Sequence, residues 1–487
     1  MHRSILILAV SLAVFLPLWG QAPEPVKLGE NLVLSGSVRS RLESWGWFTP
    51  NTGNPNYSFL GNHLRLNLTQ TGKALDWTFE LASPVLLGLP KNAVAAGAQG
   101  QLGFGATYYV ANGRNENAAQ IFPKQAFVRF KNLAGSKASS LRLGRFEFQD
   151  GSEVTAKDPS IGTIKRDRVH QRLIGPFAFT HVMRSFDGAH FVYNKPKINY
   201  TLVGAFPTRG VVQVDGWGWM KTGFLYASAT GQVQRDKNNT GEWRLFVIYY
   251  DDWRQVLKQD NRPAAARAAD RAHIGVGTYG GHFVHLTQTS VGAFDVLGIG
   301  ALQSGSWGAL SHRAGMVNVE AGYQPKILQS LKPWVRAGYY FGSGDKDPGD
   351  GKHGTFFQIL PTPRPFARFP FFDMMNNEDR FTMLTLRPHK QVVLKSEQHF
   401  LRLANRNDLW YIGGGAFQPW TFGYQARAGG GARSLANLYD LSADVTLNAH
   451  FAATLYYGYA DAKAAIRAVY PRGRVGHLGY LELNYRF

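Results

Sequence analysis

The chain has 487 residues, no cysteine and a formal charge of +20 at pH 7. The absence of cysteine excludes a disulfide-stapled fold and a lipid-modified N-terminal cysteine. Beyond the N-terminal segment no stretch approaches 18 continuous apolar residues, so the sequence predicts no membrane-spanning helix. The large positive charge indicates an anionic partner.

Residues 1–22 have the pattern of a secretory signal peptide. A short basic start precedes an apolar run from Ile5, and small residues follow near Gly20–Ala22. The run is too short for a good membrane-spanning helix. Export without cysteine is typical of the envelope of a Gram-negative bacterium. We therefore expect a signal peptide over 1–22 and a single domain over 23–487.

The dominant hydrophobic period along the rest of the chain is two. HLRLNLTQ (63–70) places three leucines on one face and Arg65 on the other. EWRLFVIYYDD (242–252) and the terminal GHLGYLELNYRF (476–487) alternate in the same way. Such segments are typical of strands that have apolar surroundings on one side and polar surroundings on the other.

Turn signals separate about 18 such strands by connections that alternate between short and long. The short ones lie near 71–74, 131–139, 195–198, 230–240, 288–292, 323–332, 388–391 and 446–449. The long ones lie near 44–57, 83–122, 147–186, 207–219, 252–271, 303–309, 343–376, 404–433 and 461–475. This order predicts an all-β fold, a transmembrane antiparallel β-barrel with short periplasmic turns and long extracellular loops. A secreted sandwich or β-helix is the alternative, because alternation alone does not tell apolar-in from apolar-out.

Several segments resemble the alginate-export family of outer-membrane porins. They include VRSRLESWGWF (38–48), LRLGRFEFQDGSEV (141–154), RDRVHQRLIGPFAFTHVMRSFDGAHF (166–191) and GSGDKDPGDGKHGTFFQILPT (342–362). The resemblance spans almost the whole mature length, and it implies an 18-stranded barrel that passes a polyuronate. One departure concerns the solute: the loop after Thr362 reads PRPFARFPFFD, where the family leads us to expect a His/Tyr-rich stretch.

The polar faces of the predicted strands supply candidate solute-binding residues in the lumen. They are Arg39, Arg41, Arg65, Arg129, Arg142, Arg244 and Arg336, with the lumen acids Glu43 and Glu80 on the same faces. Arginine binds carboxylates through two parallel hydrogen bonds and stays charged at any relevant pH, so a row of such sites would favour an anion. The alternative is a ladder of arginine and glutamate that pairs across strands and stiffens the barrel.

The long connection 147–186 adds four further candidates, Arg166, Arg168, Arg172 and Arg184. If this loop folds into the lumen, they would form a basic constriction. Otherwise they would form a solvated loop that touches lipopolysaccharide phosphates. Three aromatic residues, Trp45, Trp47 and Tyr250, would either stack on sugar faces or belong to an interface girdle.

These patterns favour a passive outer-membrane porin for anionic solutes, in particular acidic, alginate-like saccharides; a less selective anion or small-carboxylate porin is the alternative. We expect no enzyme, cofactor or metal, because no zinc-protease or nucleophile-elbow motif occurs and Asp345, Asp347 and Asp350 lack Ca²⁺-loop spacing. A barrel enzyme acting on lipid or lipopolysaccharide would depend on the pair Ser311 and His312. A surface adhesin that uses the long loops is the third hypothesis.

The expected partners follow from this location. They are the solute, outer-membrane lipid and lipopolysaccharide, and the barrel-assembly machinery; no nucleic acid is expected. The terminal Phe487 resembles the C-terminal signature that this machinery reads in outer-membrane proteins.

Overall fold

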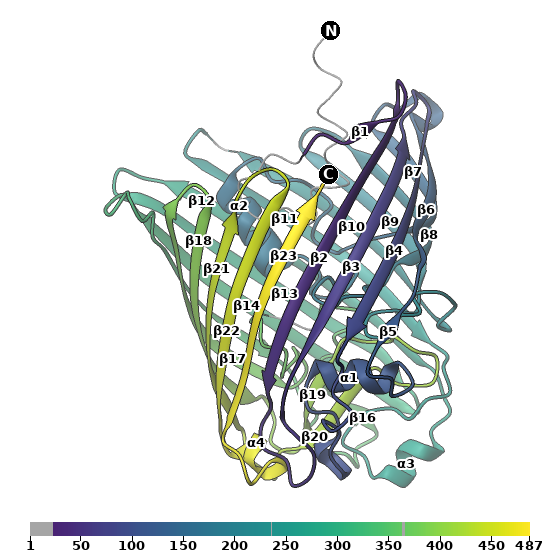
Figure 1. Cartoon of the computed structure of the whole chain (residues 1–487), viewed down its shortest axis with the longest axis vertical. Helices are drawn as coiled ribbons and strands as arrows, with labels where there is room; N and C mark the ends of the chain where they lie inside the picture. Colours follow the sequence, from purple (N-terminus) through teal and green to yellow (C-terminus); the bar gives the residue numbers. More distant parts are fainter. Residues whose placement is uncertain (1–22, 235, 363–365) are drawn as a thin grey trace.

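The structure is a computed structural model that describes residues 23–234, 236–362 and 366–487. The predicted signal peptide, 1–22, lies outside these described residues. Within them, eighteen antiparallel strands form a closed barrel (Figure 1). The barrel strands are β2 (Leu32–Gly46), β3 (Asn56–Gln70), β4 (Leu75–Leu87), β6 (Phe122–Lys131), β7 (Ser139–Phe146), β8 (Phe186–Asn194), β9 (Ile198–Pro207), β10 (Thr222–Gln234), β11 (Asn239–Asp252), β12 (Ile274–Gln288), β13 (Gly292–Trp307), β14 (Leu310–Pro325), β15 (Trp334–Gly342), β17 (Asn377–His389), β18 (Val392–Leu403), β21 (Ser434–Thr446), β22 (Phe451–Ala462) and β23 (Val475–Arg486).

Short strands and helices lie outside the eighteen barrel strands. The strands β1 (Val26–Lys27), β5 (Ala118–Ala119) and β16 (Lys352–His353) pair with barrel strands, and β19 (Leu409–Gly413) pairs with β20 (Tyr424–Ala428) in a separate hairpin. Short helical segments lie in the connections: α1 (Phe104–Ala111), α2 (Pro159–Ile164), α3 (Ala264–Ala269), α4 (Ala464–Val469), and the turns η2 (Gly97–Gln99), η3 (Leu133–Gly135) and η4 (Lys165–Val169). None of the helices in the described part of the chain has the length and apolar character needed to cross a membrane.

The last strand closes the barrel against the first. β23 pairs with β2 from Ser37↔Arg486 to Gly46↔His477. Phe487 extends this pairing, since its amide and carbonyl both exchange hydrogen bonds of 3.0 Å with Gly36. The terminal strand therefore closes the barrel, as the barrel prediction requires, and among the described residues no barrel strand keeps a free edge for the hydrocarbon to desolvate.

The alternating pattern sorts side chains between the outer wall and the lumen. On β3, Leu64 and Leu66 are exposed on the outside, whereas Arg65 points inward and forms ion pairs there. On β11, Leu245 and Val247 face outward and Arg244 is buried inside. Apolar residues therefore face out, as the barrel prediction requires.

The connections follow the predicted short and long order with one exception. β1, near the start of the described chain, and the C-terminus lie with the short turns at the top of Figure 1, and most long loops gather at the other end. The predicted long connection 303–309 is wrong, because β13 and β14 are joined by the two residues 308–309 alone. Ser304 and Ser306 gave the segment the composition of a loop, yet they continue β13. Gly308 makes the tight turn with φ +61°, a conformation that other residues avoid.

The seam between β2 and β23 gives the first testable prediction. A Cβ added at Gly36 would lie 2.5 Å from the Phe487 ring. We expect Gly36→Val to displace Phe487 and to destabilise the barrel by roughly 1–3 kcal/mol, as overpacking does. The readout is the temperature at which the folded barrel loses its fast migration on gels. Gly298→Val is the control, because nothing lies within 4 Å of its added Cβ; equal losses in both variants would contradict the prediction.

Candidate functional site

The connection between β7 and β8, residues 147–185, folds into the lumen. Its innermost part is α2, which Pro159 opens and Asp158 caps by accepting hydrogen bonds from the amides of Ser160 (2.8 Å) and Ile161 (3.1 Å). Gln324, near the short-turn end of β14, donates to Ser160 Oγ at 3.2 Å. Figure 1 shows α2 inside the barrel, toward the short-turn end. The loop therefore crosses most of the lumen before it returns.

Beneath α2 the inner wall is apolar, which corrects the expectation of polar lumen faces throughout. The inward side chains of β12 and β13 include Val284, Leu286, Leu297 and Ile299, all buried. They form one hydrophobic cluster with Ile161 and Ile164 of α2. Burial of these side chains removes apolar area from water and holds the helix against the wall. Alternation in the sequence did not reveal this apolar inner wall, because apolar residues occupy both faces of these strands in the part that contacts α2.

Buried ion pairs fix the same loop to the wall. Lys165 lies 2.6 Å from Glu242 on β11, and Arg168 lies 2.9 Å from Glu320 on β14. Glu320 also binds Arg336 at 2.8 Å, so one carboxylate joins a loop cation to a wall cation. All of these groups are almost fully buried, and removing one partner would leave an unpaired charge inside the protein.

The returning limb of the loop, residues 177–184, is held by β2. Arg39 donates to the carbonyl of Ala178 at 2.7 Å, and Arg41 donates to that of Phe179 at 2.6 Å. The His181 ring lies 2.9 Å from the Glu43 carboxylate. Burial and the nearby Arg41 lower the pKa of His181 to about 4, so its imidazole is neutral at physiological pH.

The remaining long loops fill the long-loop half of the lumen with a hydrophobic core. Trp45 and Trp47 pack there against Phe369 from loop 343–376, and all three are buried. Tyr250 is buried as well. Neither proposed role fits these aromatic residues, since buried rings contact neither membrane interface nor solute.

The same loops carry a buried carboxyl. Asp408 accepts hydrogen bonds from Thr355 Oγ (2.6 Å) and from the Tyr411 hydroxyl (2.8 Å). Burial raises the pKa of Asp408 to about 6. The contacts join loops 343–376 and 404–433 to each other.

All eleven candidate arginines lie on the lumen side, and most of them are engaged by other protein groups. Arg65 binds Glu80 and Glu147, Arg129 binds Asp76, Arg166 binds Asp167, Arg244 binds Asp150 and Glu153, Arg336 binds Asp295 and Glu320, and Arg41 binds Glu43 and Glu482. Arg172 donates to the carbonyls of Asp167 and Arg168, and Arg184 to those of Gly414 and Ala416. The acids Glu43 and Glu80 are partners in these networks. Arg41, Arg168 and Arg184 are thus anchors for the inward loops.

A second group of cations keeps contact with solvent in the lumen. It comprises Arg39, Arg65, Arg129, Arg142, Arg166, Arg368, Arg387 and Lys395; the partly exposed lumen acids among them are Glu147, Asp167, Glu397, Asp444 and Glu482. Cations are therefore in excess along this part of the wall. Burial alone would raise the pKa of the Asp167 carboxyl. The charges of Arg166 and Lys395 outweigh burial and hold this pKa well below its usual range.

Arg142 and Arg387 stand out within this group. Arg142 lies 2.7 Å from His190 Nδ1 and over the Phe146 ring, and Arg387 lies over the Trp334 ring. Within the described ranges, neither has a carboxylate at ion-pair distance. A positive charge without a carboxylate partner is the one that an incoming anion neutralises most readily.

Three of these cations, Arg368, Arg387 and Lys395, were missed by the sequence analysis. Arg368 belongs to the PRPFARF segment noted above, and it binds Asp444 on β21 at 3.0 Å. Lys395 lies on β18, whose sequence shows no clean alternation. The bulge near the end of β17 similarly obscured Arg387.

The proposed enzymatic pair does not come together. Ser311 and His312 point to opposite faces of β14, and His312 is buried in the lumen against His353 (2.9 Å) and Gln303 (3.2 Å). In the part of the chain that the structure describes, no group of three or more His, Asp or Glu side chains could hold a metal ion.

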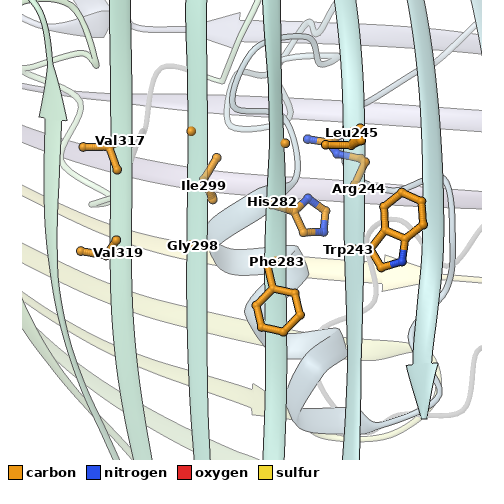
Figure 2. A pocket seen from close by; sticks show the side chains of 11 residues that line it. Trp243, Arg244, Leu245, His282, Phe283, Gly298, Ile299, Val317 and Val319 are labelled. Atoms are coloured by element: carbon orange, nitrogen blue, oxygen red, sulfur yellow. The ribbon is translucent and has the colours of Figure 1, made fainter. Parts of the chain in front are cut away.

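A hollow of about 460 Å³ lies on the outer wall, over β11 to β14 (Figure 2). The outward side chains Trp243, Leu245, Phe283, Val317 and Val319 border it, and glycines form its floor. Because the hollow is apolar and opens away from the lumen, it does not belong to the candidate site.

Comparisons with known proteins agree with this architecture. A family model described as alginate export matches residues 93–474. No curated protein matches the chain. Among solved structures, OccAB4 of Acinetobacter baumannii is 9% identical over 94% of this chain and 98% of that one, with a TM-score of 0.53. OpdK of Pseudomonas aeruginosa, solved with vanillate, is 8% identical over 93% and 98%, with a TM-score of 0.54. At such identities the likeness shows the fold alone.

Neutralising the Glu320 carboxylate tests the anchoring of the inward loop. In Glu320→Gln, Arg168 and Arg336 lose their shared partner, and we expect docking of residues 159–172 to weaken by about 3–5 kcal/mol. Hydrogen exchange of this segment is the readout. Glu116→Gln is the matched control, because its pair with Lys91 is 51% and 61% exposed and should be worth about 0–1 kcal/mol. Unchanged exchange in Glu320→Gln would show that the loop is held elsewhere.

Protonation of His181 should loosen the returning limb. The docked limb has a His181 pKa of about 4, below the ordinary value of 6.5. A released limb therefore binds the proton more readily, so the contribution of His181 to docking is present above pH 6.5 and is lost toward pH 4. Exchange of residues 177–185, corrected for intrinsic rates, should rise between pH 7 and pH 5. His181→Gln keeps a donor for Glu43 and should lose this rise; an identical rise in the variant would refute the assignment.

Proposed function

Because the chain belongs to the alginate-export family, we propose that it is an integral outer-membrane channel for anionic solutes, in particular acidic, alginate-like saccharides. The short turns then face the periplasm, and the long loops face the cell exterior. The carrying observation is the excess of partly exposed cations over acids on the lumen wall, with Arg142 and Arg387 lacking a carboxylate partner.

The arrangement suits passage better than tight capture. Arg39, Arg129 and Arg166 have protein acceptors or acids within reach, so a solute carboxylate replaces an existing contact and can be replaced in turn. Selective conduction needs sites that attract an ion and still release it. A row of exchangeable pairs supplies that balance for a chain of carboxylates.

A less selective porin for small carboxylates is the second candidate. The fold neighbour OpdK was solved with vanillate, which carries one carboxylate. The inward loops also leave a cationic wall that one small acid could follow. A polyuronate should bind more tightly than its monomer if several arginines act at once, so the ratio of the two affinities separates the candidates.

The proposal also covers how the barrel is assembled and whether it acts as an enzyme. The terminal Phe487 would be read by the barrel-assembly machinery before it closes the seam with Gly36. The porin-like barrel favours a transporter over an enzyme, and Ser311 and His312 face apart.

Single-channel recording tests the proposed selectivity. A charge about 4 Å away in water is worth about 1 kcal/mol, so removing both positive charges in Arg142→Gln/Arg387→Gln should lower the anion-to-cation permeability ratio about fivefold or more. The readout is the reversal potential in a salt gradient. Arg145→Gln is the control, because Arg145 faces the outer wall and is paired with Asp187.

Block by sugars supplies the second readout. Oligouronates should block the current at lower concentration than neutral oligosaccharides of equal length. Cation selectivity of the native channel, or block by neutral sugars without block by oligouronates, would overturn the proposal. Equal block by uronate monomer and oligomer would favour the small-carboxylate porin.

A further inference from the structure

Three arginines gather on the outer wall, near the long-loop ends of β17, β18 and β21. Arg380 is exposed on β17, opposite Tyr339 on β15 and Phe400 on β18. Arg402 lies on β18 opposite Glu378, and Arg433 directly precedes β21. Their side chains remain accessible, at 43% for Arg402 and 34% for Arg433. We call Arg380, Arg402 and Arg433 the outer arginine cluster.

One carboxylate, that of Glu378, pairs with two of the three arginines. Glu378 lies 2.5 Å from Arg433 and 3.9 Å from Arg402. Arg380 has no acidic partner at ion-pair distance among the described residues. Arg380 is paired directly opposite Tyr339 across β15 and β17, and Glu378, two positions before Arg380, is paired directly opposite Arg402 across β17 and β18, so these side chains share one part of the wall. Three cations and one carboxylate leave two positive charges there.

The position of the cluster relative to the membrane follows from its neighbours. Phe400, Tyr439 and Tyr459 are exposed on the outer wall beside it, and Leu441 and Leu455 lie farther toward the short-turn end. Aromatic residues mark the membrane interface of such barrels. A lipid-facing arginine costs about 2–4 kcal/mol at the membrane midplane and about 0–1 kcal/mol near the interface. The cluster therefore lies at the headgroup level of the outer leaflet.

Neither Arg145 nor the basic loop 147–185 offers the same site. Arg145 also faces outward, but Asp187 binds it through two hydrogen bonds of 2.7 and 2.8 Å. The basic loop 147–185, which could have met lipopolysaccharide phosphates as a solvated loop, lies inside the barrel instead.

We propose that the outer arginine cluster binds a phosphate monoester of the outer-leaflet glycolipid, the lipid A part of lipopolysaccharide. Arginine matches phosphate with two parallel hydrogen bonds, and the Tyr339 hydroxyl is a further donor. A phosphate monoester carries about −1.5 to −2 charge at pH 7, which balances the two positive charges of the site; a phospholipid diester supplies only one charge. The inference rests on the proposed outer-membrane location and not on the identity of the solute.

Titration with lipids of defined headgroup tests this site. The folded barrel in detergent is titrated with diphosphoryl lipid A, with dephosphorylated lipid A and with phosphatidylglycerol, and bound lipid is counted by native mass spectrometry. We expect diphosphoryl lipid A to bind at least tenfold more tightly than the other two. The variant Arg380→Gln/Arg402→Gln/Arg433→Gln should lose this preference, and Lys390→Gln, in a short turn at the other end, should keep it.

The following binding results would contradict the proposal. Equal binding of dephosphorylated lipid A, or unchanged binding by the triple variant, would overturn the site. Equal binding of phosphatidylglycerol would show a general anionic-lipid surface, and displacement by millimolar inorganic phosphate would show a free-phosphate site. If the triple variant fails to fold, the lipid series on the native barrel still decides. Lipid binding and channel selectivity are measured separately. Failure of the lipid A site would therefore not contradict the proposed anion channel, and failure of the channel proposal would not contradict the lipid A site.

Discussion

Closure of the sheet is the constraint on which the rest of the structure depends. In hydrocarbon a backbone N–H or C=O without a partner costs several kcal/mol, so every strand needs two neighbours. Pairing of β23 with β2, extended by Phe487 on Gly36, supplies the last of these neighbours. Once the sheet is closed, strand alternation sends one set of side chains to lipid and the other to the lumen. Charged residues therefore concentrate inside, where the inward loops and solvent can partner them.

Inside the barrel, positive charge has two separate consequences. Arginines such as Arg41 and Arg168 are buried and bind both wall acids and loop carbonyls, so they hold the inward loops in place. Others, such as Arg142 and Arg387, keep some contact with solvent and lack a carboxylate. Because arginine never loses its charge in a protein, each buried one needs a fixed partner. The pairing pattern thus separates anchoring residues from the residues that we propose bind a solute.

The outer wall carries a few cations, and part of the inner wall is apolar. An outward cation costs least near the membrane interface, which is where we infer that Arg380, Arg402 and Arg433 lie. On β12 and β13, by contrast, the outer face is apolar, and so is the part of the inner face that packs against α2. The inward course of loop 147–185 thus accounts both for the apolar inner wall and for the burial of Lys165, Arg168, Arg172 and Arg184.

Strand period and turn composition were sufficient to predict the barrel and its approximate strand number. They failed at 303–309, because small polar residues on an outer wall have the same composition as a loop. They also failed to separate anchoring arginines from exposed ones, because that distinction depends on which loop returns to which wall.

On strands with clean alternation, such as β3 and β11, the sequence by itself determined which residues face inward, since a period of two and the cost of charge in lipid leave one solution there. Only the tertiary structure decided what those residues meet. Arg168 and Glu320 are 152 positions apart in the chain, and no local pattern connects them. Their contact depends on a long loop entering the lumen, and that follows from the packing of Ile161 and Ile164 on β12 and β13.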